Sequence, residues 1–364
     1  MNKIKVNLDR KISASYEICI GNNIGDRIEM IITKNNCASR YVVVTDSNVS
    51  ALHGERFLTT LKSMGLTVDM IEIPEGEASK NINTVLDIAK KLIKMGIDRK
   101  AALIALGGGV VGDVVGFVAA IYMRGIPYYQ IPTTLLAQVD SSIGGKTAID
   151  LPEGKNLLGT FYQPKEVFID LSFLDTLPSR EFKNGMAEII KYGIIDDTEL
   201  FSLLESEAKA IMDRDMAILS SIIGKSCRIK KNIIEIDEKE TGLRRILNFG
   251  HTIGHAIEAQ SDYSISHGDG VSIGMIAAAR ISEKLKHLSG QDREKIENLI
   301  TTYDLPCRIP RSIGTKGIVS QLKVDKKKEG DTVKFVLLKK LGMPFVNGGV
   351  SEAVIEETIR ELKG

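Results

Sequence analysis

Short apolar runs alternate with amphipathic segments through the first half of the chain. The runs at residues 41–46, 68–73 and 101–106 have the length and the β-branched or small apolar residues of buried strands, and apolar residues at helical spacing fill the intervals 49–64 and 82–95. Strands that are apolar on both faces are typical of parallel sheets, because crossover helices cover both faces. The sequence therefore predicts an α/β domain with a parallel sheet between layers of helices.

Two further strand-like segments precede this alternation. Residues 4–8 and 16–20 alternate between apolar and polar side chains, which is the pattern of paired antiparallel strands. A helical stretch is expected to begin within residues 21–25. We therefore expect an antiparallel pair ahead of the parallel sheet.

A glycine motif follows the third apolar run directly. Gly107, Gly109 and Gly112 satisfy G-x-G-x-x-G, with a predicted strand before them and an apolar helix over 114–122 after them. In that context glycines let the backbone approach a pyrophosphate at a helix N-terminus, although the same glycines could simply allow tight helix–strand packing. The acid that normally follows such a motif by about 20 residues is missing. Asp46, which ends the first run, is the best candidate, so we expect a rearranged relative of the Rossmann unit.

The next polar segment combines possible capping and anion-binding residues. Thr133 and Thr134 can cap the helix that carries Asp140. Lys146 belongs to a Gly-Gly-Lys-Thr run that resembles the end of a phosphate-binding P-loop, but Asp140 stands where the full motif needs glycine, which argues against an ATPase. Lys146 is either an anion contact or a solvated lysine. Asn156, in a second polar loop, could donate to an oxyanion.

The pattern changes after a connecting segment at residues 171–180. Long amphipathic helices are predicted from there to the C-terminus, with one strand-like segment at 333–338 that suggests a small hairpin. The helices are expected to begin near 182 and to run over 199–214, 216–234, the histidine motif and on to 286, 292–303, and 351–364. We therefore divide the chain into an α/β domain, residues 1–178, and a mainly α-helical domain, residues 179–364.

Three of the five histidines are concentrated in one short stretch of the second domain. His251 and His255 are four residues apart, so a helix places them on one face, and neutral imidazoles at that spacing commonly hold a divalent metal. The alternative is an exposed histidine pair on an ordinary helix. Thr252 stands where a zinc protease motif needs its glutamate. The helix that carries Glu188 is predicted to be partly buried. An unpaired carboxylate is costly in such a place, and a bound metal would relieve that cost.

Composition excludes several classes of partner. With 48 basic and 47 acidic residues the net charge is +1, so no global field favours nucleic acid or an anionic membrane. No apolar run reaches the ~18 residues that a membrane span needs. The four cysteines are scattered and form no CxxC pair, which is typical of reduced thiols. We expect a cytoplasmic protein without a nucleic-acid or membrane partner.

Three passages, residues 107–113, 132–146 and 247–258, together closely resemble the 3-dehydroquinate synthase family. The resemblance extends from about residue 46 to residue 327. It implies an α/β, Rossmann-like NAD-binding N-terminal domain, a mainly α-helical metal-binding C-terminal domain, and a homodimer. The implied cofactors are NAD and Zn²⁺ (or Co²⁺), and the implied substrate is a small sugar acid phosphate, 3-deoxy-arabino-heptulosonate 7-phosphate.

The resemblance also implies a reaction. NAD oxidises one ring alcohol to a ketone, phosphate leaves by β-elimination, the hydride returns, and an intramolecular aldol step closes the carbocycle to give 3-dehydroquinate. Because NAD is regenerated in each cycle, the net reaction is that of a lyase. The departing phosphate is implied to take the proton of the elimination, since the sequence offers no obvious strong base.

Site residues are implied by the same resemblance. The metal ligands are Glu188, His251 and His267, which replaces the pairing of His251 with His255 suggested by spacing. The NAD-binding residues are Asp46, Glu77, Lys80, Gly108, Gly109, Val110, Asp113, Thr133, Thr134, Lys155, Thr176, Leu177 and Glu181. The catalytic residues are Asp140, Lys191, Asn248 and His255, and the substrate-binding residues are Lys146, Asn156, Lys230, Arg244, Lys326 (or its neighbour Lys327) and Arg124 from the partner subunit.

Other functions share part of this pattern. A sister sugar phosphate cyclase would keep the NAD and metal residues and change the contacts to the carboxylate, for which Lys230 and Arg244 are suited here. An alcohol dehydrogenase of the glycerol dehydrogenase type would share the domain layout. A non-enzymatic sensor would not need a full set of anion-binding and proton-transfer residues. The sequence favours the dehydroquinate reaction.

Overall fold

Six parallel strands form the sheet of the N-terminal half. The structure, a computed structural model, describes residues 15–25, 28, 38–63, 65–240, 242–261, 264–329 and 333–364, with side chains undescribed over 324–329. The strands are β1 (Glu17–Gly21), β2 (Arg40–Asp46), β3 (Val68–Ile73), β4 (Ala101–Gly107), β5 (Tyr128–Pro132) and β8 (Glu166–Asp170). Their order is β1-β8-β5-β4-β2-β3, which confirms the predicted parallel sheet.

The first strand differs in part from expectation. Within the described residues β1 pairs in parallel with β8, with Cys19 beside Phe168. The antiparallel partner predicted at residues 4–8, like most of the helical stretch predicted after residue 21, lies outside the described residues. The parallel pairing places β1 at an edge of the sheet, beside the strand that leads into the second half of the chain.

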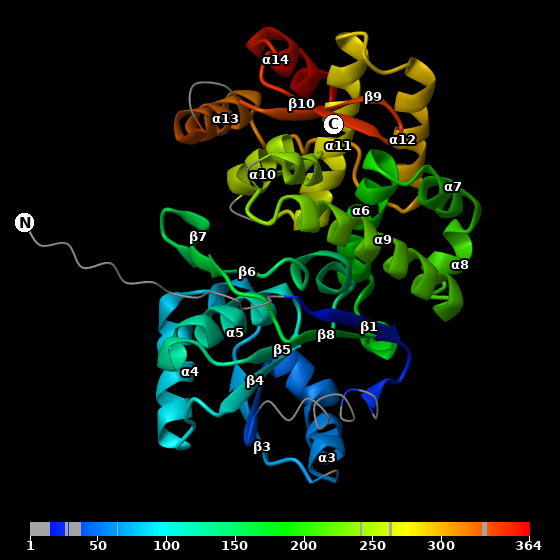
Figure 1. Cartoon of the computed structure of the whole chain (residues 1–364). Coiled ribbons are helices and arrows are strands. Elements are labelled where there is room, and N and C mark those ends of the chain that lie inside the picture. Colours follow the sequence, from blue (N-terminus) through cyan, green and yellow to red (C-terminus); the bar gives the residue numbers. More distant parts are fainter. Residues whose placement is uncertain are drawn as a thin grey trace, which may run out of the picture.

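Helices cover both faces of this sheet (Figure 1). They are α2 (Ser47–Val49), α3 (Glu55–Ser63), α4 (Ile82–Lys94) and α5 (Gly109–Ile121), with a π-helical turn at Ser50–Gly54. Because successive strand residues point to opposite faces, Val42 and Val44 of β2 pack with α4 and α5, whereas Val43 packs with Phe57 and Leu61 of α3. The helices predicted at 49–64 and 82–95 are thereby confirmed.

The strand order places a topological switch point between β2 and β4. The chain leaves β2 for β3 on one side, and leaves β4 for β5 and β8 on the other. Ligands of open α/β sheets bind beyond the carboxyl ends of the strands at such a point. Asp46 ends β2 and Gly107 ends β4, and their neighbours Thr45 and Leu106 are direct partners in the sheet. The upstream acid and the glycine motif are therefore adjacent in space.

A hairpin occupies the region that was expected to be polar loop. Strands β6 (Lys146–Leu151) and β7 (Gly154–Phe161) pair in antiparallel fashion, so the loop prediction for residues around Lys155 and Asn156 is wrong. Most of β7 is exposed and carries little apolar alternation, so it gave no strand signal. The hairpin is fixed from below by α5, where a Cβ on Gly116 would lie 2.4 Å from Cγ2 of Thr147.

The C-terminal half is mainly helical, as predicted. Its helices are α6 (Ser179–Ile195), α7 (Thr198–Ser206), α8 (Ala208–Met212), α9 (Met216–Ile236), α10 (His251–Gln260), α11 (His267–Lys284), α12 (Gly290–Thr302), α13 (Thr315–Glu329) and α14 (Glu352–Glu361). The helix expected at 199–214 is broken into α7 and α8, and α13 was not predicted. Strands β9 (Phe335–Lys340) and β10 (Met343–Asn347) form the predicted hairpin. No helix of the described residues is both long enough and apolar enough to cross a membrane.

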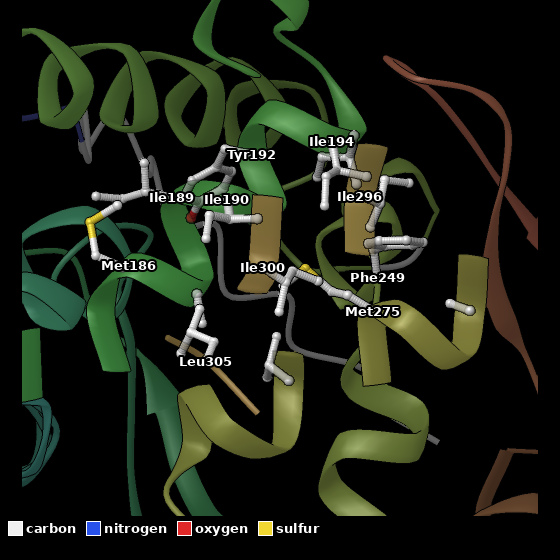
Figure 2. Close-up of a cluster of buried hydrophobic side chains, with 14 of the residues drawn as sticks. Met186, Ile189, Ile190, Tyr192, Ile194, Phe249, Met275, Ile296, Ile300 and Leu305 are labelled. Atoms are coloured by element: carbon white, nitrogen blue, oxygen red, sulfur yellow. The ribbon is translucent and has the colours of Figure 1, made fainter. Parts of the chain in front are cut away.

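Helix α6 is the centre of the C-terminal core. Figure 2 shows Ile189, Ile190, Tyr192 and Ile194 of α6 among side chains of the surrounding helices, and every residue from 184 to 195 is buried. A helix that is surrounded on all sides belongs to the interior of a large core. The same cluster includes Val167 and other β8 residues, so the core is continuous with one face of the sheet. The boundary at 178/179, which coincides with the start of α6, stays a proposal.

Candidate active site

Three helices bring one carboxylate and two imidazoles together. Glu188 of α6 lies 3.4 Å from Nε2 of His251 on α10 and 3.4 Å from Nε2 of His267 on α11, in each case measured from Oε1. One ligand atom from each residue lies within 4.8 Å of the other two. Two nitrogens and one carboxylate, with room for further ligands, are a typical donor set for Zn²⁺ in enzymes.

Glycines allow the two histidine-bearing helices to make backbone contact. A Cβ on Gly274 of α11 would lie 1.8 Å from the carbonyl oxygen of Gly250, and a Cβ on Gly254 of α10 would lie 2.8 Å from that of Gly270. Larger residues at these positions would push the helices apart. The close approach is what places His251 and His267 near one another, although they belong to different helices.

Each imidazole is oriented by a second contact. Nδ1 of His267 lies 3.2 Å from Oε1 of Glu258, and Nδ1 of His251 lies 3.1 Å from the carbonyl oxygen of Phe249. Both acceptors favour the tautomer with hydrogen on Nδ1, which leaves Nε2 free for a cation. Glu258 was not among the predicted site residues, although it lies three residues after His255 on the same helix and the sequence thus offered a weak signal.

The carboxylate of Glu188 fits a bound cation. The side chain is fully buried, and neither oxygen accepts a hydrogen bond of good geometry, although Lys191 makes an ion pair with Oε2. Burial acts to raise the pKa of Glu188, but the charges of Lys191 and His251 outweigh it and lower the pKa to about 2. An ionised, buried carboxylate with open lone pairs is costly unless a cation completes its coordination.

His255 takes a different position from the one that helical spacing suggested. Its ring lies edge-on to that of His251, with 5.2 Å between centroids, but no described carboxylate joins these two histidines in a ligand group. A second possible group joins His255 to Glu258 and His267. The triad implied by the resemblance shares the buried carboxylate of Glu188, whereas within the described residues no carboxylate joins the His251–His255 pair.

A cavity of about 520 Å³ extends from the glycine-motif helix to this cluster. Asp113 of α5 lines one part of it and His251 another. The predicted substrate residues Asp140, Lys146, Asn156, Lys191, Lys230, Arg244 and Asn248 all contribute to its walls. Four of these are cationic, and the walls also carry the acids Asp113, Asp140 and Glu240, so the positive charges are largely balanced within the cavity.

The deep cations of the cavity are already paired. Lys230 donates to Oδ1 of Asp140 at 2.6 Å and to the Asp140 carbonyl oxygen at 2.7 Å, and the hydroxyl of Tyr192 donates to the same Oδ1 at 2.7 Å. Burial acts to raise the pKa of Asp140, but Lys230 and Lys191 lower it well below its usual range. Asp140 is therefore a fixed anion between two lysines, and Tyr192, which sequence reasoning missed, holds its orientation.

Glu240 is a further cavity residue that the sequence did not reveal. Its carboxylate makes an ion pair with Lys146 and accepts a hydrogen bond of 2.7 Å from Nδ2 of Asn248. It comes from the charged segment 235–240, which resembles a solvated helix end, so its position inside the cavity gave no sequence signal. Glu240 occupies contacts that an anionic ligand would need.

The predicted cofactor residues gather around the switch point. Lys80 donates to Asp113 at 2.6 Å, and Lys155 pairs with Glu77 at 3.1 Å. Gly108 is the N-cap of α5, where no described side chain caps the first amides, so these remain available to a ligand. Thr134 Oγ1 accepts from the Ala137 amide at 3.2 Å, as the predicted cap requires.

The other predicted cofactor residues have contacts of their own. Asp46 caps α2 by accepting from the Val49 amide at 3.0 Å, and Thr176 bonds to Nε2 of His53 at 2.9 Å. The remaining members of the predicted set follow or begin these elements in the chain. Gly109 and Val110 begin α5, Thr133 follows β5, Leu177 precedes α6, and Glu181 lies in the first turn of α6. Arg214 donates to the carbonyl oxygens of Leu174, Asp175 and Leu177, which fixes the segment between the two halves.

Among the described side chains, two predicted substrate residues, His255 and Arg124, do not line the cavity. His255 is exposed on α10, and Arg124 ends the 3₁₀ turn Tyr122–Arg124 after α5, in a left-handed conformation with φ of 68°. Lys326 falls in α13, but its side chain lies outside the described part of the chain. Their roles stay predictions.

Comparison with known proteins gives concordant matches along the chain. The family model for the 3-dehydroquinate synthase N-terminal region matches residues 70–184, and that for the 3-dehydroquinate synthase C-terminal region matches residues 185–328. The 3-dehydroquinate synthase of Desulforamulus reducens is 44% identical over 98% of each chain. That of Thermodesulfovibrio yellowstonii is 42% identical over 99% of this chain and all of its own.

Solved structures of related cyclases have the same fold. A 2-epi-5-epi-valiolone synthase from Streptomyces hygroscopicus, solved with NAD⁺ and Zn²⁺, superposes with a TM-score of 0.90 at 25% identity over 99% of both chains. A 2-deoxy-scyllo-inosose synthase with carbaglucose-6-phosphate, NAD⁺ and Co²⁺ gives 0.86 at 28% identity over 94% and 96% of the two chains. An iron-containing alcohol dehydrogenase, at 14% identity and 0.66, shares the fold. Matches over nearly the whole sequence, at identities above 40%, show that the chain belongs to the 3-dehydroquinate synthase family.

Proposed function

We propose that this cleft converts 3-deoxy-arabino-heptulosonate 7-phosphate to 3-dehydroquinate and phosphate. The observation that carries the proposal is the continuity of one cavity from Asp113, beside the dinucleotide switch point, to His251 of the three-residue ligand cluster. A single small substrate in that cavity can face a hydride acceptor and a metal at once. Net turnover is that of a lyase, because the hydride returns to the same molecule.

Two cofactors complete the site. Glu188, His251 and His267 would hold a divalent metal, which supplies a Lewis acid for the alcohol that is oxidised and for the later carbonyl. NAD at the end of β4 supplies a transient hydride acceptor. The two related cyclases solved with NAD⁺, one with Zn²⁺ and the other with Co²⁺, support this pair of cofactors.

The protein would bind the substrate at the two anionic ends of the substrate, the carboxylate and the phosphate. Lys230 and Arg244 would bind the carboxylate, and the fact that both line the cavity supports this assignment. Lys146 and Asn156, on the β6–β7 hairpin, would bind the phosphate, joined by His255 and Lys326. In the proposed homodimer, Arg124 of the partner subunit would reach the same phosphate.

Proton movements use groups that surround the reacting hydroxyls. Asp140, Lys191 and Asn248 would orient these hydroxyls, and the ionised Asp140 is suited to accept a hydrogen bond. The departing phosphate, held by Lys146 and Asn156, would take the proton of the elimination. This assignment fits a cavity in which the anions Asp140 and Glu240 are already engaged with lysines.

One assay tests the function against its relatives. Purified protein with NAD and Zn²⁺ or Co²⁺ is expected to release phosphate from the heptulosonate phosphate, to form 3-dehydroquinate, and to accumulate no NADH. A chelator should stop the reaction and added metal should restore it. Turnover of a carboxylate-free sugar phosphate alone would exclude this substrate, and NADH accumulation with a simple polyol would indicate a dehydrogenase. The homodimer and the cytoplasmic location stay predictions, the first of which light scattering in solution can test.

A further inference from the structure

A closed ring of hydrogen bonds joins the cofactor side of the cavity to the substrate side. The Asp150 amide donates to the carbonyl oxygen of Lys80 at 2.7 Å. Lys80 Nζ donates to Oδ1 of Asn156 at 2.5 Å, and the Asn156 amide donates to Oδ1 of Asp150 at 2.8 Å. Two members of this ring, Lys80 and Asn156, belong to the predicted cofactor and substrate sets, whereas Asp150 has no assigned role.

The ring determines which end of the Asn156 side chain can meet a ligand. A lysine ammonium is only a donor, so the Asn156 atom that faces Lys80 must be the carbonyl oxygen. The NH₂ end of the same amide is therefore the end that can donate to an anion in the cavity, which Asn156 lines. Lys80 is itself held at 2.6 Å from Asp113, on the helix of the glycine motif. The orientation is thus fixed from the cofactor side.

The backbone at both ends of the ring is irregular. Asn156 has φ of 56°, a left-handed conformation that residues with a side chain adopt rarely and that local hydrogen bonds stabilise. Asp150 lies where the β6–β7 register shifts, between Ile149 and Leu151, so its amide and its carboxylate both face partners outside the regular ladder. The carboxylate of Asp150 is the group that holds the Asn156 amide in this conformation.

We infer that Asp150 is a positioning residue. By holding the backbone amide of Asn156, it sets the side-chain NH₂ of that residue to donate to the substrate phosphate, and it links that position to the cofactor segment at Lys80. This inference rests on the proposed function, through the role of Asn156 at the phosphate. Asp150 does not touch the substrate: it acts through a backbone amide of the residue that does. Its backbone bond to Lys80 survives any substitution except proline, and its side chain accepts a hydrogen bond from the Asn156 backbone amide while its charge also acts on Lys80 and Lys155.

The test compares Asp150→Ala with Asp150→Asn. Alanine removes the acceptor, and we expect KM for the heptulosonate phosphate to rise about tenfold, the usual loss for one hydrogen bond to a charged group, while kcat and the KM for NAD change less than about threefold. Asparagine keeps an acceptor oxygen in the same place and should restore the KM to within about threefold of wild type. A general weakening of the hairpin would raise both Michaelis constants and would not be rescued by asparagine.

Double variants separate this role from a structural one. On an Asn156→Ala background, Asp150→Ala should add no further increase in KM, because its only route to the phosphate has been removed. On a Lys146→Ala background, a matched change on the same hairpin, the two increases should multiply. Multiplication on the Asn156→Ala background, or an unchanged KM in Asp150→Ala, would overturn the inference.

A binding titration keeps the two proposals apart. Inorganic phosphate, titrated in the presence of NAD and metal, should bind about tenfold more weakly to Asp150→Ala than to wild type or to Asp150→Asn. A wild type that binds phosphate in this pattern but does not turn over the heptulosonate phosphate would contradict the proposed function and support the role of Asp150. Equal phosphate affinity in all three proteins would contradict the role of Asp150 whatever the activity.

Discussion

The ligand cluster and the cavity beside it satisfy their charges in opposite ways. In the cluster, Glu188 is fully buried, Lys191 pairs with its Oε2, and its Oε1 lies between two imidazoles without a hydrogen bond of good geometry. In the cavity, the cations already have anionic partners within the protein: Lys146 pairs with Glu240 and Lys230 with Asp140. The first arrangement leaves one oxygen of a buried carboxylate open to an ion from outside, whereas the second only exchanges one partner for another.

This difference indicates how each part meets its ligand. An incompletely compensated carboxylate in a dry core costs several kcal/mol, so the cluster is suited to an ion that stays bound through many cycles. When a substrate anion replaces the internal partner of a cation, the free energies of substrate binding and of product release both stay small. Such a site suits a substrate that must leave as product. The predictions below test this contrast, from the largest expected effect to the smallest.

Removing a ligand of the cluster should have the largest effect. We expect His251→Ala to lose bound metal and to lower turnover by at least about 10³-fold, because a Lewis acid at the reacting oxygen supplies several kcal/mol. The fold should persist, since the core around α6 is untouched. Metal content by atomic emission, phosphate release and circular dichroism measure the three quantities.

His255→Ala is the matched control for that variant, since it removes an imidazole one helical turn away. It should keep the metal at full occupancy and raise KM for the phosphorylated substrate. Metal retained by His251→Ala, or lost equally by both variants, would contradict the assignment of the triad.

Lys146→Ala should have the next largest effect, and only on the substrate side. Loss of a charged donor to phosphate is expected to raise KM for the heptulosonate phosphate up to about 100-fold, with little change in the dissociation constant of NAD. Lys155→Ala, on the same hairpin but paired with Glu77 at the cofactor side, should show the reverse pattern. Both constants follow from initial rates and from NAD fluorescence titration, and equal losses in the two variants would contradict the division of the hairpin.

The sequence alone predicted the buried strands of the fold, but it predicted the site only in part. The strands at 41–46, 68–73 and 101–106 were predictable because buried parallel strands are short apolar runs, and their order then brought Asp46 next to the glycine motif. The ligand triad was reached through family resemblance. Helical spacing alone suggested His251 with His255, because a pattern within one helix cannot reveal a carboxylate on another.

The missed features share one physical cause. Glu240, Tyr192 and Asp150 act through contacts with residues distant in sequence or through an irregular backbone, and no local periodicity marks them. The β6–β7 hairpin lacks a strand pattern because β7 is mostly exposed and its apolar residues, Leu157, Leu158 and Phe161, do not alternate with polar ones. Residues that cap, orient or counter a charge are chosen by tertiary contacts, which composition and spacing do not encode.

Glu258 tests whether the cluster depends on its outer contacts. Glu258→Gln keeps the size of the side chain and weakens the acceptor for Nδ1 of His267, so we expect about tenfold weaker metal binding, the lower end of what such changes cost. Competition with a chromophoric chelator measures this affinity directly. Glu283→Gln, an ion-pair partner of Arg293 elsewhere on α11, serves as the control and should bind metal like wild type. Unchanged affinity in Glu258→Gln would mean that the triad alone sets the affinity.

Glu240 tests the exchange of partners in the cavity, with the smallest expected effect. Glu240→Gln removes the internal anion that pairs with Lys146, and we expect sulfate, an anion that keeps its charge across the tested pH range, to bind about fivefold more tightly at low ionic strength.

The change of sulfate affinity with pH depends on the titration of Glu240 in the wild type. Burial acts to raise the pKa of Glu240, but the hydrogen bond and charge of Lys146 outweigh it and lower the pKa. A carboxyl with a lowered pKa keeps its charge as the pH falls through the ordinary glutamate range, so its pair with Lys146 persists in mild acid. Between pH 7 and pH 5 the wild type should therefore gain no sulfate affinity from Glu240, and the difference from Glu240→Gln should remain. If wild type and Glu240→Gln bound sulfate equally at pH 5, Glu240 would be losing its charge there. The ion pair of Glu240 with Lys146 would then be too weak to compensate Lys146 in the way that the comparison with the ligand cluster assumes.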